Sequence, residues 1–307
     1  MNPRLTLGTR ASPLALAQAR ATAAALEAAH GWPAGAVELH EVRTTGDKVQ
    51  DRALAEIGGK ALWTKELDQF LLDGTTQLSV HSCKDVESER PDALVIAAFL
   101  PRADVRDRLI GAPSIDALEQ GATIGTSSPR RTAQLLRRRP DLQVEIIRGN
   151  VATRLNRIAS GDYAATFLAA AGLDRLGIEE GCAIDEGTFL PAPGQAAIAI
   201  ECRADDSDTR ALLTAIDDEP THRAVLAERA FTRGVGGSCH SPVAALGRIE
   251  GDGRLWLRAE LLSSDGGAHV SGEVRAAAGD EEAAGLALAA ELLGRAPPEV
   301  RMLFTAP

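Results

Sequence analysis

Residues 8–18 read GTRASPLALAQ, and residues 125–134 read GTSSPRRTAQ. Both stretches contain Gly-Thr, then Ser-Pro, and then a glutamine six positions after the serine. Serine is a favoured helix cap and proline fits the first helical turn, so each stretch predicts a strand that ends where a helix begins. This repeat predicts two related α/β domains, and a chance similarity is the alternative.

The two predicted helix starts are suited to bind anions. The first N–H groups of a helix have no partner within it, and the helix dipole places positive charge there. Cations stand at or near such places: Arg10 in the first turn, Arg130 and Arg131 in the second, and Arg148 and Arg154 after a later predicted strand. Because arginine forms paired hydrogen bonds with carboxylates, the five together predict a polyanion site, although a surface ion pair could explain any one of them.

The densest group of reactive side chains lies at residues 78–86, LSVHSCKDV. A short apolar strand is expected to end in this run, and ligands of α/β sheets bind beyond the carboxyl ends of strands. We therefore select Asp85 as the first candidate catalytic residue. The alternative is that Lys84 and Asp85 form an exposed charge pair, which would contribute little.

Length and charge restrict the classes of function. A chain of 307 residues is long enough for two or three domains, and its net charge of -10 argues against nonspecific binding to nucleic acid or to a membrane surface. An anionic ligand must therefore meet a local cluster of cations. The signatures GxxxxGK(S/T), GxGxxG and HExxH are absent, which argues against ATP and NAD as that anion.

The cysteines predict neither a metal site nor a disulfide framework. Cys83, Cys182, Cys202 and Cys239 are far apart and form no C-x-x-C pair, and free thiols suit a reducing cytosol. No signal peptide and no long apolar segment is found, so we expect a cytoplasmic protein that does not enter a membrane. Cys239 lies in GGSCHSP, where a thiol is expected to be exposed, and an idle surface thiol is the alternative.

The rest of the pattern predicts the order of elements. Strands are expected at residues 4–9, 37–42, 94–99, 122–126, 144–147, 163–168, 196–201, 243–249, 254–262 and 269–275, and helices at 13–29, 62–72, 129–138, 151–160, 208–217, 220–232 and 280–294. The apolar run at 94–99 is typical of a strand buried in a parallel sheet, and the polar segment at 101–108 is expected to cross between domains. The strand at 196–201 could return to the first domain and make it discontinuous.

Taken together, these motifs resemble the porphobilinogen deaminase (hydroxymethylbilane synthase) family. The resemblance covers essentially the whole chain, and so many motifs in family order make a chance match negligible. The matching motifs are RxSxLA at 10–15, RTTGD at 43–47, GGK at 58–60, KEL at 65–67, VHSCKDV at 80–86, GTSSPRR at 125–131, RGNVATRL at 148–155, LAAAGLDRLG at 168–177, LPAPGQAAIAIECR at 190–203 and GGSC at 236–239.

The resemblance implies a monomeric three-domain transferase that carries a dipyrromethane cofactor on Cys239 through a thioether. It implies that four porphobilinogen molecules lose ammonia and are joined one at a time to this primer, after which hydrolysis releases hydroxymethylbilane. Asp85 matches the family's catalytic aspartate, which accepts hydrogen bonds from ring N–H groups, stabilises positive charge and moves protons. Cys83 is expected only to pack.

The resemblance also assigns binding residues, which neutralise the acetate and propionate groups of the pyrroles. Those expected to hold the cofactor are Lys84, Thr126, Ser127, Ser128, Arg130 and Arg131. Those expected to hold the substrate are Arg10, Ser12, Lys60, Arg148, Arg154, Arg175 and Gln195.

The predicted fold is α/β, with two related doubly wound domains of the periplasmic-binding-protein type, the first of them discontinuous, and a smaller α+β C-terminal domain. The expected domains are residues 1–100 with 197–216, residues 101–196 and residues 217–307. Because receptors share this architecture, a noncatalytic small-anion binding protein of the two-domain clamp type is the alternative function. The absence of a signal peptide counts against a periplasmic receptor.

Five residues depart from what is common in the family: Glu56, Ala61, Trp63, Glu87 and Gly234. Glu56 stands where many relatives have a lysine, and Glu87 replaces a proline. These departures put in doubt the contacts of the loop around residue 60, while the aspartate, the cysteine and the main arginines are all present.

Overall fold

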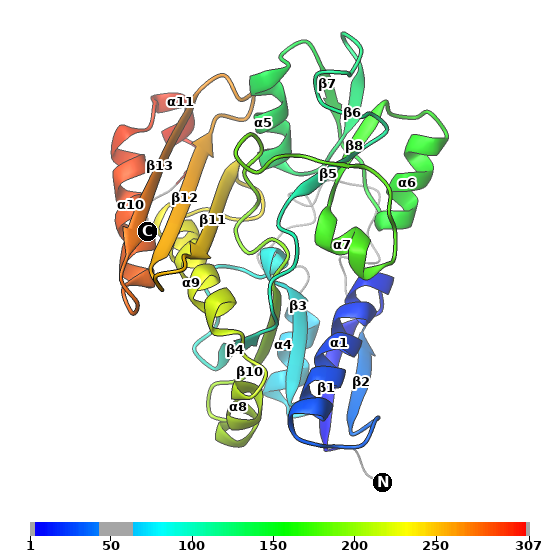
Figure 1. Ribbon diagram of the computed structural model, residues 1–307, viewed down its shortest axis with the longest axis vertical. Coiled ribbons are helices and arrows are strands. Elements are labelled where there is room, and N and C mark those ends of the chain that lie inside the picture. Colours follow the sequence, from blue (N-terminus) through cyan, green and yellow to red (C-terminus); the bar gives the residue numbers. More distant parts are fainter. Residues whose placement is uncertain (1–3, 43–63, 305–307) are drawn as a thin grey trace. The chain divides into compact units, whose positions relative to one another are not determined.

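A computed structural model gives the structure of residues 4–42 and 64–304 (Figure 1). They belong to two compact units, of which unit 1 spans residues 1–103 and 196–222 and unit 2 spans residues 104–195 and 223–307. The expected turn at 43–47 and the positions Glu56, Lys60, Ala61 and Trp63 lie outside the described residues. Within those residues, no helix has both the length and the apolar character needed to cross a membrane.

Unit 1 is built on a five-stranded sheet with the order β2-β1-β3-β10-β4. The strands are β1 (Leu5–Arg10), β2 (Val37–Val42), β3 (Leu78–Ser82), β4 (Leu94–Phe99) and β10 (Ile198–Arg203). β1 runs parallel to β2 and β3, and β10 runs antiparallel to both β3 and β4. The return of the later strand to the first sheet is thereby confirmed.

Unit 2 contains a second sheet with the order β7-β6-β8-β5-β9. The strands are β5 (Asp107–Ile110), β6 (Thr123–Gly125), β7 (Gln143–Glu145), β8 (Ala165–Ala169) and β9 (Cys182–Ala183). Again three parallel strands are followed by two antiparallel pairings. The two sheets therefore share one topology, as the repeated stretches predicted, and β5 takes the place in this sheet that β10 takes in the first.

Two expectations about strands were wrong. The apolar run Leu94–Phe99 is an edge strand that pairs only with antiparallel β10, and its middle residues are only partly buried. Its apolar character reflects packing against α8 (Ser207–Thr214) and not a place inside a parallel sheet. Arg10 is the last residue of β1 and does not lie in the following turn. The polar segment at 101–108 ends in β5, which had not been expected.

The two helix starts in the repeated stretches are as predicted. In α1 (Pro13–Ala29), the Ser12 side chain accepts a hydrogen bond from the Ala15 N–H, and in α5 (Pro129–Arg138), Ser128 does the same for the Arg131 N–H. Each cap satisfies one N–H group that the helix itself leaves unpaired. Besides α8, the described helices that pack on the two sheets include α4 (Lys65–Leu72), α6 (Val151–Ala159) and α7 (Ala170–Arg175), and a short 3-10 turn, η1, lies at Cys83–Asp85.

A third, antiparallel sheet forms the C-terminal part of unit 2, where β11, β12 and β13 lie side by side in chain order (Figure 1). The elements are β11 (Val243–Ile249), β12 (Leu255–Leu262), β13 (His269–Ala276), α9 (Glu219–Gly234), α10 (Glu281–Arg295) and α11 (Pro298–Arg301). Alternate residues of the strands pack with α9 and α10 in one core that includes Phe231, Leu257 and Leu288. The predicted α+β character of this region is confirmed.

Close packing of α9 against α10 explains one departure from the family pattern. A Cβ atom at Gly234 would lie 2.7 Å from the Cβ of Ala289, which is closer than real Cβ contacts allow. At Gly285, a Cβ atom would meet the carbonyl oxygen of Ala227 and lie 2.9 Å from the backbone nitrogen of Phe231. The two helices can therefore approach each other only because glycine stands at both positions.

We expect Gly285→Ala to lower the free energy of unfolding by about 1–3 kcal/mol, because the added methyl group meets backbone atoms that cannot turn aside. Urea unfolding measures this change. Gly294→Ala, in the last turn of α10, is the matched control, since its Cβ would meet nothing within 4 Å. If Gly285→Ala were as stable as the wild type, the close approach of the two helices would be wrong.

Candidate active site

Asp85 lies in a small polar pocket of unit 1, at the carboxyl ends of β1 and β3. The pocket has a volume of about 60 Å³. Its lining residues are Arg10, Ser12, Leu14, Ala15, Gln18, Val80, His81, Ser82 and Asp85. Three residues selected from the sequence, Arg10, Ser12 and Asp85, are thus brought together, although they come from two separate stretches of the chain.

The backbone around Asp85 is held by short contacts to neighbouring elements. The Cys83 N–H donates to the Ala197 carbonyl at 3.0 Å, and the Val86 N–H closes the η1 turn onto the Cys83 carbonyl at 3.0 Å. One residue earlier, Ser82 exchanges two hydrogen bonds with the Gln18 side chain of α1, at 2.9 and 3.1 Å. The η1 turn that carries Asp85 is therefore tied to Ala197, the residue before β10, and the strand end that precedes it is tied to α1.

The Asp85 side chain is half-buried. Its carboxylate accepts no hydrogen bond and forms no ion pair among the described residues. A carboxylate at a pocket wall that the protein does not itself satisfy is suited to accept N–H donors from a ligand. Lys84, its neighbour in η1, is also half-buried and has a partner in the structure. Cys83 is buried, in agreement with a packing role.

A buried charge cluster adjoins this pocket, and sequence reasoning missed it. The fully buried Glu201 carboxylate accepts hydrogen bonds from the Nε and Nη2 groups of Arg90, at 2.7 and 2.9 Å. Arg90 Nη2 also donates a hydrogen bond to Asp68, at 2.5 Å. His81 Nε2 lies 3.5 Å from Glu201. Burial raises the pKa of Glu201, but His81 and Arg90 outweigh this effect and lower the pKa to about 2. Glu87 also pairs with Arg90, at 2.9 Å, so this departure from the family has an ionic role.

Asp107 is the centre of a second buried cluster, in unit 2. It is fully buried and accepts from Arg130 Nη2 at 2.8 Å, from Arg131 Nη2 at 2.6 Å and from Gln195 Nε2 at 3.0 Å. The structure thus brings together three residues that were predicted to bind ligands. Asp107 itself was missed, because nothing in PRADVRDR distinguishes it from Asp104, the other acidic residue of that segment.

The two arginines of this cluster already donate many of their hydrogen bonds to other residues of the protein. Arg130 also donates to Gln134 and to the Leu190 carbonyl, and Arg131 donates to the Phe167 carbonyl at 2.8 Å. Burial lowers the pKa of Arg130, and the nearby Asp107 charge partly offsets this. Two arginines share one aspartate here, so the cluster keeps an excess of positive charge. A ligand role for Arg130 and Arg131 stays a prediction.

The N-terminus of α5 carries the remaining predicted cofactor contacts of unit 2. Ser128 caps the helix, and its own N–H donates to the Thr126 hydroxyl at 3.2 Å. Thr126 is buried, whereas Ser127 and Ser128 are half-buried. The three residues therefore form the turn between β6 and α5, next to the Asp107 cluster in sequence and in space.

Arg148 and Arg154 stand on either side of the turn into α6. Asn150 caps this helix through the Thr153 N–H at 3.0 Å, and Arg154 Nε donates to the Gly149 carbonyl at 3.1 Å. The Nε atom of Arg148 is buried and has no hydrogen-bond acceptor among the described residues. A buried cationic donor without an acceptor costs free energy unless a ligand supplies one, so a carboxylate fits this position.

Arg175 ends α7 and is half-buried, and burial lowers its pKa. Cys239 is exposed on the loop that joins α9 to β11. Local hydrogen bonds between Ser238 and Ser241 shape this loop, with the Ser238 N–H 3.1 Å from the Ser241 hydroxyl. Cys182, on β9, is the other cysteine exposed in the described chain, while Cys83 and Cys202 are buried.

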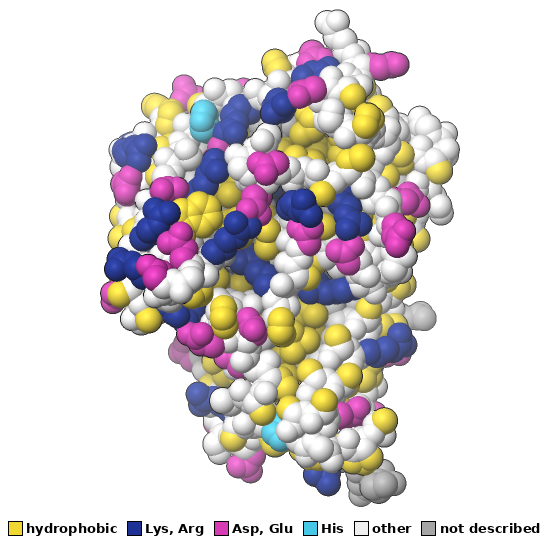
Figure 2. All heavy atoms as spheres, in the orientation of Figure 1, with side chains coloured by type: hydrophobic (Ala, Val, Ile, Leu, Met, Phe, Trp, Pro, Cys, Tyr) yellow, Lys and Arg dark blue, Asp and Glu magenta, His cyan; other side chains and the backbone are white. Residues whose placement is uncertain are grey.

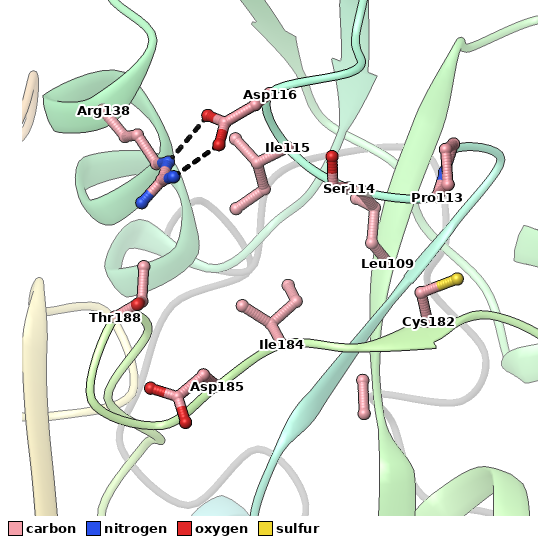
Figure 3. A pocket seen from close by; sticks show the side chains of 11 residues that line it. Leu109, Pro113, Ser114, Ile115, Asp116, Arg138, Cys182, Ile184, Asp185 and Thr188 are labelled. Atoms are coloured by element: carbon pink, nitrogen blue, oxygen red, sulfur yellow. Dashed lines mark hydrogen bonds and ion pairs between the residues drawn. The ribbon is translucent and has the colours of Figure 1, made fainter.

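Unit 2 contains a larger pocket, with a volume of about 210 Å³. Figure 3 shows the side chains that line it. The pocket contains Cys182 and the exposed Arg138–Asp116 ion pair, but none of the residues that were predicted to bind or react. Figure 2 shows cationic and anionic side chains interspersed on the visible face, without a large patch of one sign. Within the described residues no group of acidic, histidine and cysteine side chains could hold a metal ion.

Two family models match the chain. The model described as "Porphobilinogen deaminase, dipyromethane cofactor binding domain" matches residues 5–211, and the model described as "Porphobilinogen deaminase, C-terminal domain" matches residues 222–294. Among curated proteins, the chain is 55% identical to porphobilinogen deaminase of Sphingopyxis alaskensis, covering 99% of this chain and 97% of that protein. It is 48% identical to the porphobilinogen deaminase of Paracoccus denitrificans, covering 97% and 96%.

Solved structures with a similar backbone share little sequence with the chain. A double mutant of the BvgS VFT2 domain from Bordetella pertussis is 16% identical, with a TM-score of 0.41, covering 75% of this chain and 93% of that one. The periplasmic aliphatic sulphonate binding protein SsuA from Escherichia coli is 12% identical, with a TM-score of 0.41, covering 76% and 70%.

Proposed function

The chain belongs to the porphobilinogen deaminase family, and from this premise we propose that it is a transferase of tetrapyrrole biosynthesis. It deaminates four porphobilinogen molecules, joins them stepwise to a covalent dipyrromethane primer and releases hydroxymethylbilane by hydrolysis. The family match favours this enzyme over a noncatalytic anion-binding protein. The observation that carries the proposal within the molecule is a pocket that holds Arg10, Ser12 and the Asp85 carboxylate, which has no partner in the described part of the chain.

The residues present fit the dipyrromethane group. The exposed Cys239 thiol is accessible for a thioether bond, and the buried Nε atom of Arg148 offers a cationic donor to a pyrrole carboxylate. Once attached, the group supplies the terminal pyrrole to which substrate is joined. Lys84, Thr126, Ser127, Ser128, Arg130 and Arg131 would hold its carboxylates.

In this proposal, cations neutralise the acetate and propionate groups of the substrate, and neutral polar side chains add hydrogen bonds. The residues are Arg10, Ser12, Lys60, Arg148, Arg154, Arg175 and Gln195. Charge-assisted hydrogen bonds of this kind each contribute about 1.5–3 kcal/mol. The partly buried state of Arg148 and Arg175 supports their assignment, because a cation that is already partly desolvated attracts a carboxylate more strongly.

Asp85 is assigned the chemical steps. Its carboxylate accepts a hydrogen bond from a pyrrole N–H, which stabilises positive charge as ammonia leaves, and then accepts the proton that the ring carbon loses when the new carbon–carbon bond has formed. Ser82 and Gln18 hold the end of β3 in place, so the carboxylate keeps its position through repeated cycles. The proton is the only species that Asp85 takes up.

The remaining proposals concern the domains, the oligomeric state and the location of the protein. We propose three domains, at residues 1–100 with 197–216, 101–196 and 217–307, because each of these ranges contains one of the three sheets. We also propose a monomer that works in the cytoplasm, where four reduced cysteines would persist.

Intact-mass measurement tests the proposed function. The wild type, purified from cells that make porphobilinogen, is expected to carry the additional mass of two pyrrole units. The addition should vanish in Cys239→Ser and persist in Cys182→Ser, which removes the other exposed thiol. An unmodified wild type, or loss of the addition in both variants, would contradict the assignment.

A further inference from the structure

The Asp85 carboxylate has no side-chain partner within the described chain, so its backbone alone fixes where it lies. The contacts described above hold the chain before it, through Ser82 and the Cys83 N–H, and close the η1 turn itself. After η1, residues 86–93 form neither a helix nor a strand before β4 begins. A segment without a regular backbone ladder opens easily unless side chains hold it. Side-chain contacts after Asp85 therefore decide how firmly the carboxylate is positioned.

Arg90 ties this segment to the sheet of unit 1. Its Nε and Nη2 groups donate to the two carboxylate oxygens of Glu201 on β10, at 2.7 and 2.9 Å, and its Nη1 group donates to Glu87 at 2.9 Å. Glu87 is two residues after Asp85, and β10 lies between β3 and β4 in the sheet. The guanidinium thus bridges the chain just after the catalytic carboxylate to an inner strand.

The Arg90 guanidinium is a rigid bridge. It also donates to Asp68 of α4 at 2.5 Å and to the Thr64 hydroxyl at 3.4 Å, so every N–H group of the planar fork has an acceptor. The Arg90 side chain is 8% exposed and that of Glu201 is fully buried, and ion pairs are stronger in such a low-dielectric interior. Burial lowers the pKa of Arg90, but Glu201 and Asp68 outweigh this effect and raise the pKa, so Arg90 stays a cation.

We propose that Glu87 and Arg90 are positioning residues that act through the Asp85 backbone: their ion pair holds the segment after η1 to β10 and so fixes the carboxylate at the pocket wall. Neither residue touches the substrate or the cofactor in this role. A proline at position 87 would restrict the same backbone by fixing φ. The ion pair achieves this restriction through side chains instead. The inference rests on the proposed role of Asp85.

The first test is Glu87→Ala, assayed with the cofactor attached. We expect kcat to fall about 10-fold, less than the roughly 100-fold that a 1 Å misplacement can cost, because the contacts before Asp85 remain. KM should change by less than about twofold, since the substrate arginines are untouched. Amide hydrogen exchange in residues 83–87 should become faster, because the Val86 N–H bond that closes η1 opens more often.

Asp68→Ala is the matched control. It removes another carboxylate that Arg90 holds, with a side chain that is 13% exposed against 23% for Glu87, but this carboxylate belongs to α4 and not to the segment after Asp85. Burial raises the pKa of Asp68 despite the nearby Arg90, so the loss of its charge should be tolerated. The bridge from Glu87 to β10 remains, and this variant should keep the wild-type kcat and the wild-type exchange in residues 83–87.

Glu87→Pro is a second test, and it does not depend on the ion pair. Val86 has φ −97° and ψ 132°, which is the extended backbone that a residue before proline requires. Proline can therefore enter position 87 and restrict the segment without Arg90. We expect Glu87→Pro to recover most of the kcat that Glu87→Ala loses. A loss caused by the missing carboxylate itself would persist in both variants.

The outcomes separate this inference from the proposed function. Wild-type turnover in Glu87→Ala, an equal loss in Asp68→Ala, or a Glu87→Pro as slow as Glu87→Ala would overturn the positioning role while leaving the enzyme assignment intact. A wild type without the two-pyrrole mass would instead remove the proposed function. A slow Glu87→Ala with faster exchange, beside Glu87→Pro and Asp68→Ala variants close to the wild-type rate, supports the positioning role.

Discussion

Asp85→Asn is expected to lower kcat by about 10²–10⁴-fold, the range that a general acid or base contributes. Asparagine has nearly the same shape, and its carbonyl oxygen can still accept one hydrogen bond from a pyrrole N–H. It carries no negative charge and cannot take up a proton, so both the stabilisation of the cation and the proton transfer are lost. We expect KM to change much less than kcat, because the arginines assigned to the substrate carboxylates are untouched.

The measurement uses steady-state turnover of protein whose intact mass shows the attached cofactor, so that poor loading is not mistaken for poor catalysis. Glu89→Gln provides the matched control, since it removes an exposed carboxylate four residues further along the chain. That variant should turn over like the wild type. Near-normal turnover in Asp85→Asn would remove Asp85 from the catalytic role.

Asp107→Asn is expected to lower the free energy of unfolding by about 3–5 kcal/mol. The fully buried Asp107 carboxylate is shared by Arg130 and Arg131 at 2.8 and 2.6 Å. When its charge is removed, two buried guanidinium groups face each other with no anion between them. Because a native protein is typically stable by only about 5–15 kcal/mol, this loss is a large part of the total.

Urea unfolding of the purified protein measures the effect. Asp116→Asn is the matched control, because Asp116 forms a comparable ion pair with Arg138 at 2.5 Å, but both side chains are largely exposed. Exposed pairs contribute about 0–1 kcal/mol, so this variant should unfold close to the wild type. If the two variants were equally stable, the buried ion pairs of Asp107 would contribute no more to the free energy of unfolding than an exposed pair does.

The local elements of this chain were predictable because their signals lie within a few residues. Ser12 and Ser128 cap their helices as expected, since serine and the following proline decide a helix start without help from distant residues. The strands and helices after residue 205 follow from periodicity in the same way. The edge position of Leu94–Phe99 could not be predicted in this way, because an apolar run does not specify its partner strand.

The candidate site was predictable in part. Asp85 and Arg10 could be selected because reactive residues at the carboxyl ends of strands are typical of ligand sites in α/β sheets. The anions that organise the site were not found. Asp107 is 23 residues from Arg130, and Glu201 is 111 residues from Arg90. Contacts across such separations depend on which strands pair, and no local pattern reports that.

By itself, the sequence determined the repeated strand–helix units, the reactive stretch around Asp85 and the exposed thiol at Cys239, because each depends on neighbouring residues. Only the tertiary structure decided which charged groups face each other inside the protein. The pairing of β10 with β3 brings Glu201 to His81, and packing around β5 brings two arginines to Asp107. Burial in a low-dielectric interior makes such pairs strong, and burial is a property of the whole fold.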